Sequence, residues 1–219
     1  MDIQNKKILF LGDSITEGYG PQDIENVYWK RLERSCGCVS VGFGISGTRI
    51  ARQQKPADPP SRMDLDFNLR AQDMEPEADV VIVFGGTNDY GHGDAPMGTP
   101  ADRTPDTFYG AMHSLVITLL SRYPTAKLLF LTPLHRADET RTVTRDGESF
   151  TVTLKEYVEV MREVLEFYGI PVLDLYASGS MNPQVPAMRE TYVPDGLHPN
   201  AAGHRLLADR IIAYFRANY

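Results

Sequence analysis

The chain has 219 residues and a formal net charge of −7, with 42% hydrophobic and 23% charged residues. This length and composition predict a soluble globular protein with one domain over residues 1–219. The excess of acidic residues argues against nucleic acid and anionic membrane surfaces as partners. No apolar segment approaches the roughly 20 residues that a membrane anchor needs.

The N-terminal segment and the cysteines bear on the cellular compartment. Residues 1–7 form a short polar lead that leaves no room for a signal peptide. Cys36 and Cys38 are too close together for an ordinary disulfide, and no further ligand makes them a zinc site. We therefore expect free thiols and a cytoplasmic protein, with secretion as the alternative if the natural chain is longer.

Short apolar runs alternate with amphipathic stretches along the chain, which predicts alternating strands and helices. The clearest strand is 80–84, a continuous Val/Ile/Phe run of the kind found in buried parallel sheets. The other strands are predicted at 8–11, 38–43, 127–132 and 170–175, and the helices at 25–34, 63–74, 107–122, 154–168 and 200–216. Residues 178–193 are expected to be irregular. This order predicts a flavodoxin-like three-layer α/β/α sandwich around a five-stranded parallel sheet of order 2-1-3-4-5.

Two connections are longer than such a fold needs. Residues 90–105 form a polar loop of a length that usually carries function or is disordered. At about 135–152, two β-prone runs flank Asp146 and Gly147, which predicts a hairpin insertion. Because Phe150 and Val152 share one face, we expect this hairpin to pack on the active-site rim or on a neighbouring subunit of a homo-oligomer. A solvent-exposed ribbon is the alternative.

The three glycine-containing turns after the first three strands open onto one edge of the sheet. They carry Ser14, Gly47 and Asn88. This edge is where open α/β sheets bind their ligands. Taken singly, Ser14 and Asn88 could equally be helix caps.

A fourth segment supplies a carboxylate and an imidazole. Asp195 and His198 lie three residues apart, just before the last predicted helix. At that spacing Asp195 can accept a bond from Nδ1 of His198, which leaves Nε2 free to take a proton from Ser14. The Ser14 and Gly47 backbone N–H groups and the Asn88 amide could then stabilise an oxyanion.

With these four segments the sequence resembles the GDSL, or SGNH, hydrolase family of esterases and lipases. The resemblance extends over nearly the whole chain, in the family's order. It implies that Ser14 is the nucleophile, His198 the base, Asp195 its partner, and Gly47 and Asn88 oxyanion donors. The matching segments are Gly12-Asp13-Ser14-Ile15-Thr16, Ser46-Gly47, Gly86-Thr87-Asn88-Asp89 and Asp195-x-x-His198-Pro199.

The resemblance implies a serine esterase that uses an acyl-serine intermediate and no metal or cofactor. We expect a small-molecule or carbohydrate ester with a short acyl group such as acetyl as the substrate. Lysophospholipase and thioesterase activities are the alternatives within the family. The rival from another class is a non-catalytic flavodoxin-like module that binds an anion on its strand-end turns.

The remaining polar residues have structural interpretations. Asp13 is expected to bond neighbouring turns, and Arg49 to form an ion pair rather than touch substrate. The apolar stripe at 108–120 is expected to be core. The other histidines are expected on the surface or on helix faces: His92, His113, His135 and His204.

Overall fold

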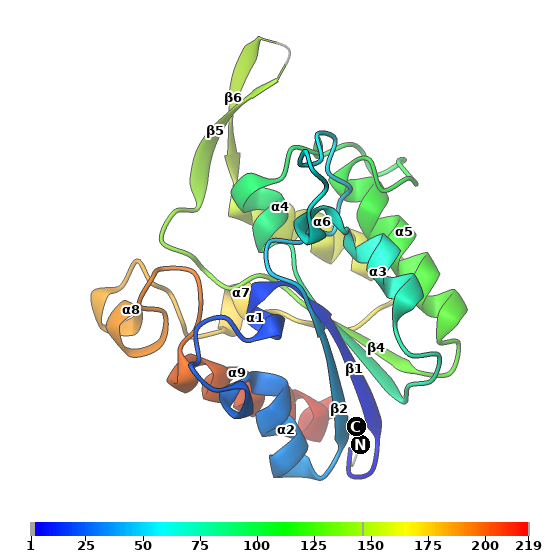
Figure 1. The fold of residues 1–219 in the computed structure, drawn as a ribbon, viewed down its shortest axis with the longest axis vertical. Helices are drawn as coiled ribbons and strands as arrows, with labels where there is room; N and C mark the ends of the chain where they lie inside the picture. Colours follow the sequence, from blue (N-terminus) through cyan, green and yellow to red (C-terminus); the bar gives the residue numbers. More distant parts are fainter. Residues whose placement is uncertain (1–2, 146, 219) are drawn as a thin grey trace.

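The computed structural model describes residues 3–145 and 147–218. A parallel five-stranded sheet of order β2-β1-β3-β4-β7 forms its centre (Figure 1). This order confirms the predicted fold class, with β7 as the fifth strand of the sheet. The strands are β1 (Lys7–Gly12), β2 (Val39–Gly44), β3 (Val80–Phe84), β4 (Lys127–Leu131) and β7 (Val172–Leu173).

Helices cover both faces of the sheet (Figure 1). One face carries α2 (Tyr28–Cys36) and α9 (Ala201–Asn218), and the other carries α3 (Phe67–Asp73), α5 (Phe108–Arg122) and α6 (Leu154–Phe167). None of the helices in the described ranges is long and apolar enough to cross a membrane. The shorter elements are α1 (Ser14–Glu17), α4 (Thr87–His92), α7 (Leu175–Ser178), α8 (Pro186–Tyr192) and the 3-10 turns Ile24–Asn26 and Arg62–Asp64.

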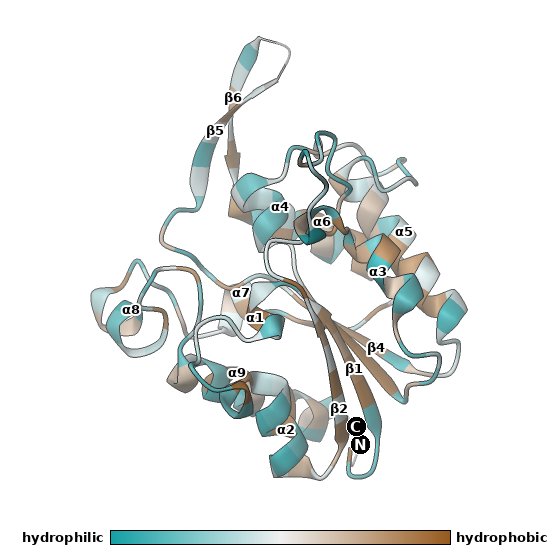
Figure 2. Cartoon of the chain, in the orientation of Figure 1, coloured by the Kyte–Doolittle hydropathy of each residue, from teal (hydrophilic) through white to brown (hydrophobic). Residues whose placement is uncertain are grey.

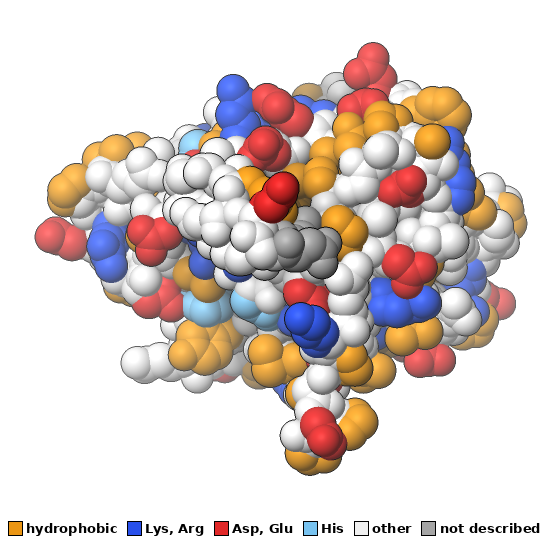
Figure 3. All heavy atoms as spheres, turned by 90° about the horizontal axis from the view of Figure 1, so that it is seen from above, with side chains coloured by type: hydrophobic (Ala, Val, Ile, Leu, Met, Phe, Trp, Pro, Cys, Tyr) orange, Lys and Arg blue, Asp and Glu red, His pale blue; other side chains and the backbone are white. Residues whose placement is uncertain are grey.

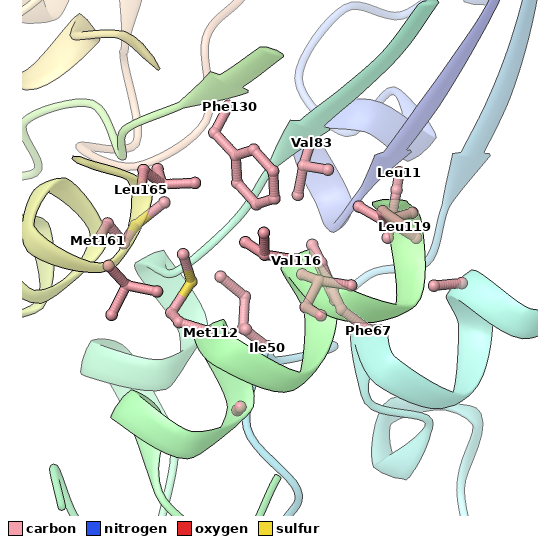
Figure 4. Packing of buried hydrophobic residues seen from close by; sticks show 14 of the residues in the cluster. Leu11, Ile50, Phe67, Val83, Met112, Val116, Leu119, Phe130, Met161 and Leu165 are labelled. Atoms are coloured by element: carbon pink, nitrogen blue, oxygen red, sulfur yellow. The ribbon is translucent and has the colours of Figure 1, made fainter. Parts of the chain in front are cut away.

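The central strands are hydrophobic on both sides because each face of the sheet is covered. Alternate residues of β1 enter different clusters: Ile8 and Phe10 pack with α2 and α9, whereas Leu9 and Leu11 pack with α3 and α5. Figure 4 shows the second cluster filling the space between sheet and helices. In Figure 2 the strands form the brown centre of the molecule, and the outer surfaces of the helices are largely teal. Every residue of β3 is buried.

Four sequence-based expectations need correction. The predicted helix 63–74 starts later, at Phe67, after a separate 3-10 turn at Arg62–Asp64. The predicted strand 170–175 is only two residues long, because Asp174 caps α7 by accepting a bond from the Ala177 N–H. The predicted helix 25–34 starts later, at Tyr28, after a separate 3-10 turn. The segment 178–193, predicted to be irregular, contains α8. Within the described residues, neither Cys36 nor Cys38 is in a disulfide.

The predicted hairpin forms outside the main sheet. Its strands β5 (Thr140–Arg145) and β6 (Glu148–Thr153) pair antiparallel and project away from the body of the protein (Figure 1). Phe150 remains 38% exposed, whereas Val152, nearer the base, packs against the core. Asp146, in the predicted turn, lies outside the described residues. The base of the hairpin therefore contacts the domain while the outer part does not bury its apolar side chains there.

Candidate active site

Ser14 lies at the point where β1 ends and α1 begins. Asp13 caps this short helix, because its carboxylate accepts a 3.0 Å bond from the Ile15 N–H. Burial raises the pKa of the Asp13 carboxyl to about 7. As the first residue of α1, Ser14 has a backbone N–H without an acceptor inside the helix. Both its hydroxyl and its N–H are therefore available at the carboxyl edge of the sheet.

A hydrogen-bonded chain joins Ser14 to the loop before α9. Ser14 Oγ lies 3.0 Å from His198 Nε2, and His198 Nδ1 lies 2.7 Å from Asp195 Oδ2. The other Asp195 oxygen accepts bonds from the Leu197 and His198 N–H groups. Burial opposes ionisation of Asp195, but the backbone N–H groups and His198 outweigh it and hold its pKa below the usual value. A carboxylate only accepts, so Nδ1 carries the proton and Nε2 accepts from Ser14.

Glu17, one turn after Ser14 on α1, connects this helix to the turn that carries Gly47. Its carboxylate accepts a 2.7 Å bond from the Ser46 N–H, accepts from the Ser46 hydroxyl, and pairs with Arg62. Gly47 has a φ of +77°, and a Cβ there would lie 2.3 Å from Cε of Met63. Only glycine fits this turn without strain. The sequence patterns gave no indication of the role of Glu17.

Asn88 is the second residue of α4 and is 5% exposed. Its Nδ2 donates one hydrogen to the Thr48 carbonyl at 3.0 Å, which leaves the second hydrogen of the amide. The next residue, Asp89, accepts bonds from the Ile50 and Ala51 N–H groups. Burial raises the pKa of Asp89 to about 6. The segments after β2 and β3 are thus bonded to each other, and both strands flank β1.

The other polar residues near these turns have partners within the protein. Arg49 is almost fully buried, lies 3.6 Å from Asp64 and donates to the Met63 carbonyl and to His92 Nδ1, in keeping with the expected ion pair. His204 is fully buried in α9, so it lies on a helix face rather than the surface. Residues 3–145 and 147–218 contain no group of three or more His, Cys, Asp or Glu side chains that could hold a metal ion.

Tyr19 contacts His198 from the end of α1, another contact that the sequence patterns did not indicate. The two ring centroids are 4.3 Å apart, and Tyr19 is 59% exposed. Figure 3 looks down on this end of the molecule and shows histidine side chains at its surface. The imidazole that bonds Ser14 is therefore bordered by an aromatic ring that solvent and ligands can reach.

The model of the GDSL-like lipase/acylhydrolase family matches residues 10–206. The chain belongs to this family. The matched span of this GDSL-like family model includes all the residues of the hydrogen-bonded chain and of the turns after β1, β2 and β3.

Solved structures similar to this GDSL-like chain cover almost its whole length. A Lactobacillus plantarum protein shares 31% identity over 99% of both chains, with a TM-score of 0.82. The aryl esterase of M. smegmatis shares 21% identity over 98% of this chain and 100% of its own, with a TM-score of 0.69. A proposed GDSL-like lipase from Bacteroides uniformis shares 20% identity over 97% of this chain and 96% of its own, with a TM-score of 0.70. None of the curated proteins compared with the chain matches it.

Proposed function

We propose that this protein is a serine esterase that hydrolyses short-chain acyl esters through an acyl-Ser14 intermediate. The observation that carries the proposal is the continuous chain of bonds from Ser14 Oγ through His198 to Asp195. Its polarity suits a general base, since Nε2 is the nitrogen that accepts. Membership in a family of lipases and acylhydrolases supports the same reaction class.

In the first half-reaction, Ser14 Oγ attacks the ester carbonyl carbon while His198 Nε2 takes the hydroxyl proton. The resulting oxyanion accepts bonds from the Ser14 N–H, the Gly47 N–H and the free hydrogen of the Asn88 amide. When the tetrahedral intermediate collapses, the C–O bond to the alcohol breaks and His198 returns its proton to the departing oxygen. A water molecule, deprotonated by His198, then attacks the acyl-Ser14 carbonyl carbon. The bond from this carbon to Ser14 Oγ breaks, Oγ takes the proton back from His198, and the carboxylic acid leaves.

The alcohol must leave next to His198, because His198 protonates it. Tyr19 exposes its ring on that side, so it offers an apolar surface to a flat or aromatic alcohol. An acetylated sugar would also stack on such a ring. The aryl esterase activity named for the M. smegmatis relative fits the first of these substrates. Lysophospholipase and thioesterase activities would use the same residues, so lysophospholipids and thioesters are the alternative substrates.

A fluorophosphonate and an ester panel test the proposal together. We expect the probe to label Ser14, as located by peptide mass spectrometry, and Ser14→Ala to abolish labelling. The panel should combine acetyl to decanoyl chains with aryl, sugar and thiol leaving groups, and turnover should be highest for short acyl groups. Labelling at another residue would refute the assignment of Ser14. A protein that is neither labelled nor active on any ester would favour a non-catalytic binding module.

A further inference from the structure

The segment that leads from β4 into the hairpin runs between α4 and the loop before α9 (Figure 1). Two consecutive residues of this segment bond to the two sides of the candidate site. Arg136 Nη1 donates to the Thr87 carbonyl at 3.0 Å, and the Ala137 N–H donates to the Gly196 carbonyl at 2.8 Å. Thr87 immediately precedes Asn88, and Gly196 immediately follows Asp195.

Arg136 contacts the first turn of α4 in more than one way. Its Nη1 also lies 3.3 Å from Thr87 Oγ1, and its guanidinium lies over the Tyr90 ring at 5.2 Å. Its own backbone is fixed by Glu139, which accepts a 3.0 Å bond from the Arg136 N–H. Arg136 is therefore held at its backbone and at its guanidinium, and the guanidinium restrains the helical turn that carries the Asn88 amide.

Two glycines leave the space that this arrangement needs. A Cβ on Gly91 would lie 2.6 Å from Nη1 of Arg136, and the other nearest atoms would also belong to that guanidinium. A Cβ on Gly196 would lie 2.7 Å from Cβ of Ala137. The close approach on both sides shows that the segment is packed against α4 and against the catalytic loop, rather than merely passing between them.

We propose that Arg136 and Ala137 form a clamp that sets the distance between the Asn88 amide and the Asp195–His198 loop, with Arg136 as a positioning residue. The inference rests on the proposed esterase function. The clamp matters because the oxyanion donor and the base reside on separate elements, one after β3 and one before α9. Misplacement of such groups by about 1 Å can cost on the order of 10²-fold in rate.

The neighbouring Arg141 provides a matched control. It also lies over the Tyr90 ring, at 5.8 Å, and also donates to carbonyls of the α4 segment, those of Gly91 and Gly93. These carbonyls are at the end of the helix away from Asn88. Loss of Arg141 therefore removes a similar charge, ring contact and pair of bonds without releasing the turn that carries the oxyanion donor.

The test compares kcat and KM of variants, normalised to the fluorophosphonate-reactive sites in each preparation. Arg136→Ala should lower kcat by about 10- to 10²-fold with little change in KM, Arg136→Lys should recover part of the loss, and Arg141→Ala should stay within about twofold of wild type. Equal kcat values for Arg136→Ala and Arg141→Ala would overturn the clamp. A wild-type protein without any esterase turnover or probe reaction would instead refute the proposed function, and the clamp with it.

Gly91→Ala gives a second test that leaves Arg136 in the chain. The new methyl group should displace the guanidinium, while alanine is a better helix former than glycine. We expect kcat to fall as in Arg136→Ala, the thermal midpoint not to fall, and the double variant to be no slower than Arg136→Ala alone. Independent, multiplicative losses in the double variant would overturn the inference, because they would show that Gly91 does not act through Arg136.

Discussion

Two regions meet at the Ser14 hydroxyl: the turns after β1, β2 and β3 on one side, and the loop before α9 on the other. The turns are bonded to one another and are buried or half-buried, as the 5% exposure of Asn88 and its bond to Thr48 illustrate. The loop is more open, and the Asp195 side chain is 48% exposed. The side that would bind the oxyanion is thus rigidly built into the sheet, whereas the acid–base side depends on a few contacts along one loop.

The largest expected losses of kcat come from changes to the hydrogen-bonded chain of Ser14, His198 and Asp195. Ser14→Ala and His198→Ala should each lower kcat by about 10⁶-fold, and the double variant should be no worse than either, because the two residues act as a unit. Asp195→Asn should cost less, about 10⁴-fold, because the loop backbone still positions the ring. Burst-free steady-state kinetics on an activated ester measure kcat for the three single variants and the double variant. An Asp195→Asn variant as inactive as His198→Ala would mean that orientation of the ring depends wholly on the carboxylate.

Removal of Asn88 tests the buried side. Asn88→Ala should lower kcat by about 10²- to 10³-fold with little change in KM, because the amide acts on the oxyanion of the transition state more than on the bound ester. Asn68→Ala is the control, since Asn68 is a buried asparagine that donates only to the Ile50 and Ala111 carbonyls. It should reduce stability but leave kcat per reactive site unchanged. Unchanged kcat in Asn88→Ala would remove Asn88 from the oxyanion site.

Asp13, in the turn after β1, and His204, in the helix α9 that follows the loop, should make the free energy of unfolding respond to pH with opposite signs. Burial raises the pKa of Asp13 to about 7, so the folded protein holds a proton that the unfolded chain loses above about 3.8. The free energy of unfolding should therefore decrease as pH rises from about 4 to 7. Burial lowers the pKa of His204 in α9 to about 3. Below about pH 6.5 the unfolded chain therefore binds a proton on this histidine, whereas the folded protein does not bind it until the pH approaches 3. That contribution should be lost as pH falls from about 6.5 to 3.

Denaturant unfolding at a series of pH values measures both contributions, each with a slope of at most about 1.4 kcal/mol per pH unit. Asp13→Asn should remove the part of the decline between pH 4 and 7 that Asp13 contributes and leave the part from Asp89, whose pKa is raised to about 6. His204→Asn should remove the acid-side loss, whatever either change does to the mean stability. Slopes that match wild type in both variants would show that other groups govern the pH dependence.

The smallest effect on catalysis is expected from the outer part of the hairpin. Thr142 and Thr151 face each other in the ladder, so an Asn-Gly turn can replace residues 143–150 and leave Arg141 in place. Turnover of a small ester should stay within about twofold, because the hairpin projects away from the body of the protein (Figure 1). We expect the change to appear instead in selectivity for large alcohols or in the mass measured by light scattering. If selectivity and mass both stay the same, the outer hairpin has neither role.

Most of the fold could be predicted because its strands are recognisable in the sequence as short apolar runs. A strand such as 80–84 is buried on both faces, so its residues are all apolar and the run can be recognised from the local sequence alone. The α8 helix was missed for the opposite reason: none of its side chains is buried, so its sequence shows no apolar period. The two-residue β7 was overestimated because apolar residues continue beyond the point where Asp174 caps the next helix.

The positions of Ser14, Gly47 and Asn88 could be predicted because each follows a recognisable strand, and parallel strands end at one edge. The supporting contacts could not. Glu17 bonds Ser46, and Arg136 bonds Thr87, 49 residues away in the chain. Such pairs leave no local pattern, since each partner alone is an ordinary polar residue of the sequence. They become visible only when the fold brings distant segments together.

The bond between Ser14 and His198 joins residues 184 positions apart. Under the proposed function, Ser14 leaves the ribosome during synthesis before His198 has been added to the chain, so the serine has no base until then. The same separation makes a chromogenic ester a reporter of completed folding. In a refolding experiment, activity cannot return before α9 has docked, whereas circular dichroism can recover earlier from the helices alone.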